Sequence, residues 1–326
     1  MGNKLLKISF IIIGRNEGWK LTKCFQSVFQ TIKQNSLSKY EVIYVDSKST
    51  DDSIERVKVF EKTKIFQLTS DINAAIARNV GAIESKGDVL FFIDGDMEII
   101  PDFIPLVYNE SDSLKYNFVS GQFEDYYYSK KGVLIDKQLY HSMVSNERQE
   151  YTTGGLFLIK RNIWEKISGM KNHLRRNQDI DLGIRLAGIN IFLIRRKELL
   201  AKHHTIKYQD KHRIWSDFIK GNDLFRSILH RENFKNFYQH KLFIRENYTL
   251  LLLLVNIGVI LLNNNSMYGV IYLGLIGLRS IKNVKYSIIE LLNIYAYYIL
   301  RDFAVLSAFF LYWPQKEKNI NYIQID

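Results

Sequence analysis

Two carboxylates, Asp94 and Asp96, stand one residue apart at the end of an apolar run in VLFFIDGDMEII, residues 89–100. Asp-Gly between apolar runs is a strong signal for a tight β-hairpin, because glycine adopts positive φ without strain. Paired carboxylates after a buried strand would instead hold Mg²⁺ or Mn²⁺ against a diphosphate, whose charge the cation neutralises. This stretch alone leaves both interpretations open and slightly favours the hairpin.

The elements that must position these carboxylates are short apolar runs that alternate with amphipathic stretches between residues 5 and 195. The pattern predicts strands over 7–13, 40–46, 64–69, 88–94, 116–123, 155–161 and 189–195, and helices over 21–32, 52–61, 73–85 and 179–188. Such alternation indicates an α/β domain with a mostly parallel sheet, in which ligands bind at the carboxyl ends of the strands. The polar residues that follow the predicted strands are Asn16, Glu17, Asp46, Asp94 and Asp96.

Composition narrows the class of partner. The 326 residues are 47% hydrophobic, enough for a sizeable core, and carry a formal charge of +11, which favours an anionic partner. The single cysteine, Cys24, excludes an intramolecular disulfide and a cysteine-based zinc cluster. The first residues lack the pattern of a signal peptide, so we expect the globular part to face the cytoplasm.

The last third of the chain differs in composition from the first two thirds. Residues 250–262, 268–278 and 287–313 are strongly apolar, and basic residues flank them at 241–245, 279–285 and 316–318. The first two segments are shorter than the roughly 20 residues that span a bilayer, and the third carries charges. We expect a membrane-attached region, with a short hairpin and a third segment that crosses the bilayer or lies along it. The alternative is a soluble helical subdomain with a very apolar core.

Six stretches, in order, resemble the family 2 glycosyltransferases of the GT-A fold. They are SFIIIGRNEGWKLTKCFQSV, YEVIYVDSKSTDDS, AAIARNVGA, GDVLFFIDGDMEI, TGGLFLIKR and NQDIDLGIRLAG, and they cover roughly residues 7–195. No single motif is specific, but six in the family's order are. The resemblance implies a Rossmann-like α/β fold with helices on both faces of the sheet. The apolar C-terminal segments resemble those of membrane-attached bacterial members that build polysaccharides and lipid-linked glycans.

The resemblance implies roles for the donor-side residues. DGD looks like the family's DxD element, in which Asp94 would contact the ribose or the donor sugar and Asp96 would bind Mn²⁺ or Mg²⁺ at the diphosphate. Asp46 looks like the nucleobase-binding aspartate, and Arg78 like the basic residue that supports the nucleotide; Asn16 and Glu17 belong to the same binding region. Lys48 and Asp52 replace frequent glycines after Asp46.

On the acceptor side, Asp179 falls where inverting members of the family carry the catalytic base. Gln178 replaces the glutamate that usually precedes this aspartate, and Asp181 is a competing candidate at a position where the family uses an acid to brace the helix. Gly154 and Gly155 look like the glycines that let the backbone approach donor and acceptor sugars. Either His203 or His204 would complete the metal site, with His204 preferred.

These expectations combine into one prediction. Residues 1–240 form the transferase domain, with a nucleotide-binding part (1–100) and an acceptor part (101–240), and residues 241–326 form a membrane-associated helical region. The resemblance implies an inverting, metal-dependent transferase that uses a nucleotide-diphosphate sugar, with uridine preferred, and a lipid-linked or polysaccharide acceptor. It would act at the cytoplasmic face of the cell membrane, in contact with membrane lipids and not with nucleic acid; oligomerisation is left open.

Other functions remain open at this point. Direct transfer to polyprenyl phosphate, as in relatives similar to dolichol-phosphate-mannose synthase, is the nearest alternative. A nucleotidyltransferase fits poorly, because IIIGRNEGWK is not a glycine-rich basic loop. A nucleic-acid-binding protein would explain the charge but not the acids, and a silent membrane scaffold would have no chemical use for Asp94, Asp96 and Asp179 together.

Overall fold

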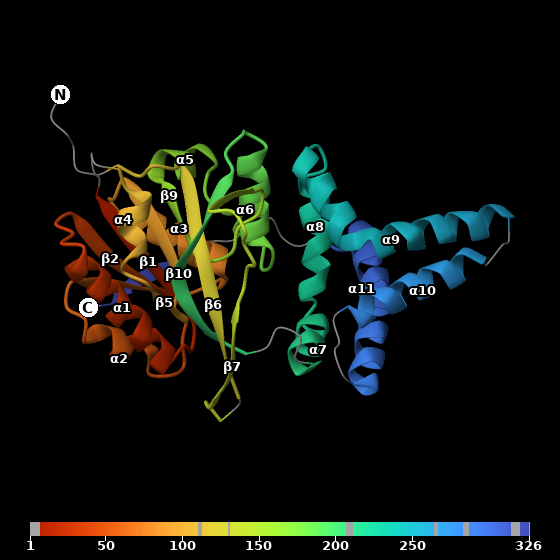
Figure 1. Ribbon diagram of the computed structural model, residues 1–326, viewed down its shortest axis with the longest axis horizontal. Coiled ribbons are helices and arrows are strands. Elements are labelled where there is room, and N and C mark those ends of the chain that lie inside the picture. Colours follow the sequence, from red (N-terminus) through yellow and green to blue (C-terminus); the bar gives the residue numbers. More distant parts are fainter. Residues whose placement is uncertain are drawn as a thin grey trace. The chain divides into compact units, whose positions relative to one another are not determined.

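The computed structural model describes residues 7–109, 113–129, 131–206, 211–263, 267–282, 287–313 and 320–325 (Figure 1). The chain divides into two compact units, one of Met1–Ile206 with Gln315–Asp326 and one of Lys207–Pro314. The boundary therefore lies at residue 206 and not at the predicted residue 240. The C-terminal end also rejoins the first unit, because β11 (Tyr322–Ile325) pairs antiparallel with β3 (Thr63–Leu68).

One mixed sheet organises the first unit. Its strands in the described ranges follow the order β11-β3-β2-β1-β4-β9-β6-β10-β5, with β7 paired to β6 and β8 to β10. The pairs β3-β2, β2-β1 and β1-β4 are parallel, as is β6-β10, and the remaining pairs are antiparallel. The strands not yet bounded are β1 (Ile8–Gly14), β2 (Tyr40–Asp46), β4 (Val89–Asp94), β5 (Met97–Ile99), β6 (Phe118–Tyr128), β7 (Leu134–Leu139), β8 (Glu147–Glu150), β9 (Phe157–Lys160) and β10 (Leu193–Thr205).

The apolar runs form strands because both faces of the sheet are covered. Along β1, Phe10 and Ile12 join one buried cluster, whereas Ile11 and Ile13 join another on the opposite face. Helices α1 (Trp19–Gln34), α2 (Ser53–Lys58) and α4 (Phe103–Val107) supply the first cluster; α3 (Ala74–Glu84), α5 (Arg161–Lys166) and α6 (Gln178–Ala187) supply the second. The predicted α/β architecture, with helices on both faces of the sheet, is confirmed.

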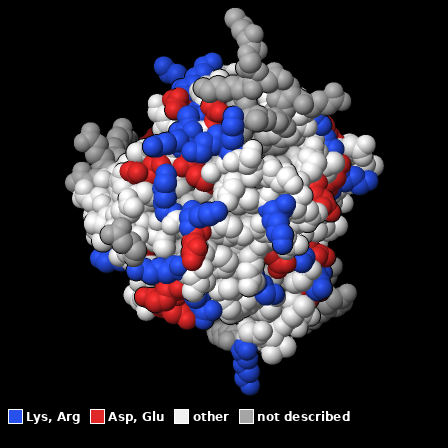
Figure 2. Space-filling view, turned by 90° about the vertical axis from the view of Figure 1, so that its left-hand side faces the viewer, with Lys and Arg blue, Asp and Glu red and all other residues white. Residues whose placement is uncertain are grey.

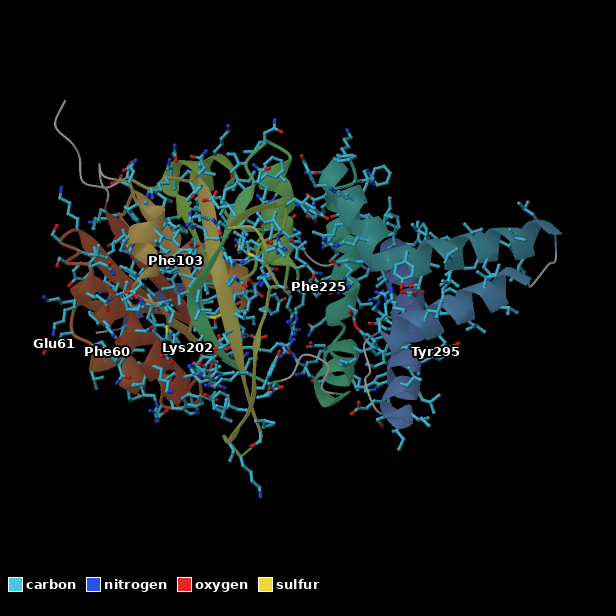
Figure 3. All side chains as sticks on the ribbon, viewed as in Figure 1. Phe60, Glu61, Phe103, Lys202, Phe225 and Tyr295 are labelled. Carbon is cyan, nitrogen blue, oxygen red and sulfur yellow. The ribbon has the colours of Figure 1, made fainter. Side chains whose placement is uncertain are left out.

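The second unit is helical in its described residues. It contains α7 (Lys211–Ile219), a short 3₁₀ turn (Asn222–Leu224), α8 (Phe225–Glu232), α9 (Phe237–Asn263), α10 (Met267–Ile281) and α11 (Ile288–Leu311), on which Tyr295 lies (Figure 3). A kink at Asn247 separates the polar start of α9 from its apolar remainder. Arg231 closes the end of α11 by donating to the carbonyl oxygens of Ala308, Phe309 and Tyr312 at 2.6–3.1 Å.

Two helices in the described part of the second unit are long and apolar enough to cross a membrane, by length and composition: Phe237–Leu262 and Ile288–Leu311. Only 28% of the most apolar window of each is buried. A core helix of a soluble protein would be mostly buried, so these helices present apolar side chains that the protein itself does not cover.

Candidate active site

The predicted site lies where parallel strands end side by side. In the register of the sheet, Gly14 of β1 is paired with Asp46 of β2, and Ile13 with Asp94 of β4. The loops that follow these strands therefore start from one edge of the sheet. This is the location at which α/β proteins bind ligands, because the strand order allows loops to diverge there.

Asp46 is fully buried and is held by a ring of donors. It accepts hydrogen bonds from the Tyr44 hydroxyl (3.0 Å), the Ser49 N–H (2.8 Å) and the Gln67 amide (3.0 Å). Lys48 has a φ of 61°, a left-handed conformation that glycine adopts more readily. The loop thus keeps the glycine-type backbone even though Lys48 replaces the glycine that the resemblance implied.

Asn16 and Glu17 connect the first loop to the second. Thr50 N–H donates to the Asn16 side-chain oxygen at 2.7 Å, and Asn16 N–H donates to the Ser49 hydroxyl at 2.9 Å. Glu17 forms an ion pair with Lys20, whose ammonium also lies 4.0 Å from Asp96. Burial and the nearby Asp96 raise the pKa of Glu17. Asn16 therefore fixes the loop after Asp46, and Glu17 contributes to a dense group of acids.

Arg78 and Asp94 form an ion pair beneath the site. Arg78 is 2% exposed, its guanidinium donates to the Asp94 carboxylate, and it approaches the Gly155 carbonyl oxygen at 3.4 Å. A Cβ on Gly155 would lie 1.9 Å from Asp94 Oδ2, whereas one on Gly154 would meet nothing within 4 Å. Burial raises the pKa of Asp94 although Arg78 opposes the shift. Gly155 is thus a glycine because the backbone passes directly over Asp94.

The DGD stretch is not a hairpin. The strand after it, β5, pairs antiparallel with β10, and not with β4. Gly95 N–H donates to the Ile13 carbonyl oxygen at 2.7 Å, which ties the turn to β1. The chain therefore leaves the parallel part of the sheet at Asp94, and Asp96 stands on the connection to β10. The hairpin interpretation is wrong, because the two runs belong to different strand pairs.

Two histidines approach this turn from β10. His203 Nε2 lies 3.3 Å from Asp96 Oδ2, and its Nδ1 lies 2.7 Å from Asp125. His204 contacts Glu98 (3.0 Å) and the Tyr128 hydroxyl (3.0 Å) through its two ring nitrogens. The alternation of a strand sends the two rings to opposite faces. The structure therefore places His203, and not the preferred His204, beside Asp96.

Asp96 and His203 suit a divalent cation. Burial alone would raise the pKa of Asp96, but the His203 contact and Lys20 outweigh it and lower that pKa; the two carboxylates raise the pKa of His203 to about 9 despite burial. Among the described residues no group of three His, Cys, Asp or Glu side chains is arranged to hold a metal. One carboxylate and one imidazole match a metal that completes its shell with phosphate oxygens and water.

Asp179 is the second residue of helix α6, which begins at Gln178 directly after Asn177 in the left-handed conformation. Burial raises the pKa of Asp179, whereas the positive charge of Arg78 and local backbone N–H groups oppose the shift. Arg78 therefore acts on both Asp94 and Asp179, which places the two acids in one electrostatic environment. Gln178 precedes Asp179 in the sequence. The side-chain oxygen of Gln178 is buried without a hydrogen-bond partner, an arrangement that suits a bound ligand.

Asp181 has a structural role instead. Its carboxylate is fully buried and accepts from Lys171 (2.9 Å) and Arg185 (2.7 Å). Arg185 also donates to the carbonyl oxygens of Ile167 and Gly169, which ties α6 to the preceding loop. The position is that of an acid that braces the helix.

We expect Asp181→Ala to lower the free energy of unfolding of the first unit by about 3 kcal/mol, because it leaves the cations of Lys171 and Arg185 beside an empty buried site. Chemical denaturation of the purified variant measures this loss. The catalytic alternative for Asp181 requires the opposite result, full stability with abolished transfer.

Sequence reasoning missed Asp125, Tyr44 and Gln67. Asp125 is 1% exposed and contacts His203, whereas Tyr44 and Gln67 donate to Asp46. Asp125 lies beyond the predicted strand over 116–123, and only the pairing of β6 with β10 brings it to His203. Lys202, the preceding residue on β10 (Figure 3), pairs with Glu98 at 2.8 Å on the other face.

This fold and site define an α/β domain with a group of acidic side chains at the ends of its parallel strands. Residues 9–197 match the profile described as Glycosyl transferase family 2, so the chain belongs to that family. The match covers more than half of the chain and confirms both the predicted family and the predicted class of the domain, a glycosyltransferase.

Individual relatives agree with this class. The chain is 29% identical over 177 residues to an uncharacterized glycosyltransferase of Haemophilus influenzae, covering 49% of this chain and 56% of the relative. It is 26% identical over 191 residues to the glycosyltransferase AglE of Haloferax volcanii, covering 55% of this chain and 61% of the relative. The chain thus spans less than two thirds of the length of these curated relatives.

Two solved structures are similar at low identity. One is GalNAc-T7 with UDP, GalNAc and Mn²⁺ (TM-score 0.49, 18% identity, 63% of this chain and 44% of that chain). The other is S. aureus TarS 1–349 with UDP (TM-score 0.48, 15% identity, 75% of each chain). At these scores they add nothing to the assignment of individual residues.

Proposed function

We propose that this protein transfers a sugar, with inversion, from a nucleotide-diphosphate sugar to a lipid-linked or polysaccharide acceptor at the cytoplasmic face of the cell membrane. The observation that carries the proposal is that the buried Arg78 acts on both Asp94, at the end of β4, and Asp179, at the start of α6, with Asp96 two residues after Asp94. A silent scaffold has no need to keep three partly buried acids near one another, because each costs free energy to desolvate.

The donor is expected to lie across the strand ends. Asp46, with Asn16 and Glu17 behind its loop, would accept from an N–H of the nucleobase, for which uracil is our choice. Asp94, held by Arg78, would accept from a ribose or sugar hydroxyl. Asp96 and His203 would hold Mn²⁺ or Mg²⁺, which supplies positive charge that stabilises the departing diphosphate.

The chemical step needs one base. Asp179 would take the proton from the acceptor hydroxyl as that oxygen forms its bond to the anomeric carbon and the bond from that carbon to the diphosphate oxygen breaks. The attack comes from the face opposite the leaving group, so the configuration inverts. Gly155 would let the backbone lie close to Asp94 and the donor sugar, and Gln178 would offer its unpaired oxygen to an acceptor hydroxyl.

The transfer itself is the direct test. Membranes that contain the full chain are incubated with radiolabelled nucleotide sugars and Mn²⁺, and label is counted in the organic-extractable lipid and in polymer. We expect label from one donor to enter one of these fractions, and chelation of the metal to stop it. If no donor labels either fraction, the proposed activity is wrong; label on polyprenyl phosphate alone would favour the nearest alternative acceptor.

Membrane attachment is supported by the uncovered apolar side chains of the second unit. Leu261 and Leu262 of α9 are 80% and 83% exposed, and Leu311 of α11 is 81% exposed. Lys241 and Arg245 precede the apolar part of α9 and suit an anionic leaflet.

On the face in Figure 2, basic and acidic side chains are interspersed, which does not resemble the basic stripe of a nucleic-acid-binding surface.

We therefore expect Leu261→Asp with Leu262→Asp to weaken membrane partitioning by roughly thirtyfold or more, because one carboxylate in hydrocarbon costs about 2 kcal/mol or more. Flotation of the protein with liposomes measures the bound fraction. Ile219→Asp is the matched control, since Ile219 on α7 is 81% exposed but lies outside the apolar helices. Equal behaviour of both variants would contradict insertion of α9.

A further inference from the structure

Asp125 is a buried carboxylate to which the proposed reaction gives no role. It lies on β6, is 1% exposed, and accepts from the Tyr127 hydroxyl at 3.0 Å. Its other oxygen lies 2.7 Å from Nδ1 of His203. A carboxylate that is desolvated to this degree must be compensated by close donors, and the imidazole is one of them.

The pairing of neighbouring strands places His203 between Asp125 and Asp96. In the parallel pair β6-β10, Asp125 is the direct register partner of His203, and in the antiparallel pair β10-β5, His203 is the partner of Met97, the residue after Asp96. The ring of His203 thus lies between two carboxylates, with Nδ1 towards Asp125 and Nε2 at 3.3 Å from Asp96. Phe123 packs edge-on against this ring at 5.8 Å between centroids and restricts its rotation.

We propose that Asp125 is a positioning residue for the metal site: it accepts the Nδ1–H of His203, so that Nε2 presents its lone pair to the cation bound at Asp96. The inference rests on the proposed function, since it assigns a residue behind the same metal. A carboxylate behind a metal-binding imidazole fixes the tautomer and the ring orientation and makes the ligand nitrogen more basic.

Mn²⁺ binding to the full, detergent-purified chain tests this directly. The free ion is followed by its electron paramagnetic resonance signal, with Mn²⁺ titrated alone and again with UDP. We expect Asp125→Ala to weaken Mn²⁺ binding by about 10- to 100-fold. Asp125→Asn, which keeps an oxygen for the Nδ1–H and nearly the same shape, should recover part of the loss and also serves if the alanine variant folds poorly.

Two further variants separate positioning from a general structural effect. Tyr127→Phe removes the hydroxyl that donates to Asp125 but keeps the histidine contact, so Mn²⁺ affinity should stay within about threefold of wild type. In a His203→Ala background, Asp125→Ala should cause no additional loss, because it acts through that ring. A structural role would lower the affinity by the same factor in both backgrounds.

The outcomes distinguish this inference from the proposed function. If the wild-type chain binds Mn²⁺ and both Asp125 variants bind it equally well, the positioning role is wrong and the metal site stands. The positioning role is also wrong if the loss persists undiminished in the chain that lacks His203. If the wild-type chain binds no Mn²⁺ under either condition, both the metal-dependent function and the role of Asp125 are wrong.

Discussion

Asp179→Asn is expected to lower the rate of sugar transfer by about 10²- to 10⁴-fold while leaving donor affinity unchanged. The amide keeps the size and most of the polarity of the side chain at the start of α6, but it cannot accept the proton of the acceptor hydroxyl. Transfer rates at saturating donor, together with nucleotide binding to the same variant, measure the two quantities separately. Normal turnover by this variant would show that Asp179 is not the base.

The pH dependence of the wild-type enzyme gives an independent check of the same assignment. Burial raises the pKa of Asp179, with Arg78 opposing. A base acts in its deprotonated form, so the rate is complete above this pKa and falls as the pH falls through it. We expect the acid limb of the profile to lie above the range of an exposed aspartate, and we expect Asp179→Asn to lose that limb.

Gly155→Ala is expected to reduce transfer by about 100-fold with little change in stability. The added Cβ would lie 1.9 Å from Asp94 Oδ2 and 2.7 Å from the Arg78 guanidinium, so the Asp94 carboxylate must move. A displacement of a donor-binding group by about 1 Å lowers the rate of transfer strongly, whereas it changes the free energy of folding little. Steady-state transfer kinetics and thermal unfolding of the variant measure both effects.

The neighbouring glycine supplies the control for this prediction. A Cβ on Gly154 would meet nothing within 4 Å, so Gly154→Ala should transfer sugar at close to the wild-type rate. If both alanine variants are equally active, the backbone at Gly155 does not approach the donor site as we infer. If both are equally impaired, the effect comes from chain stiffness and not from the contact with Asp94.

The sequence was most informative where an element is determined by its own residues. The apolar runs at 7–13, 40–46, 64–69 and 88–94 became β1 to β4, because burial on both faces gives a continuous hydrophobic signal. The sequence was least informative where a strand pairs with another strand that is far away along the chain. The strand β5 has three residues and exists only through its pairing with β10, about 100 positions later.

The same distinction between local and distant interactions explains which site residues were predicted from the sequence. Asp46, Arg78, Asp94 and Asp96 were found from their places after strands or in motifs, and the structure groups Arg78 with Asp94. The choice between His203 and His204 depended on which face of β10 meets Asp96, and neighbouring residues of a strand cannot be distinguished without the register. Asp125 gave no local signal, since its role depends on the β6-β10 pairing.

The position of the domain boundary also depends on contacts between residues that are far apart in the sequence. The basic composition of residues 196–246 gave no sign of a boundary within them, but residues 207–314 pack among themselves. The strand β11 was missed because YIQI is a short run whose pairing with β3 spans about 250 residues of sequence. The Tyr322 hydroxyl donates to Glu84 at 2.6 Å and helps to hold it.

In the function that we propose, the chain binds a nucleotide diphosphate through a metal held at Asp96. The most direct measurement is calorimetric titration of the detergent-purified chain with a panel of nucleoside diphosphates, with and without Mn²⁺, for wild type and Asp96→Asn. We predict that one nucleotide binds, that Mn²⁺ strengthens its binding by at least about tenfold, and that Asp96→Asn removes this gain. If no nucleotide binds, or if Mn²⁺ strengthens binding equally in the variant, Asp96 does not hold a metal that binds the diphosphate.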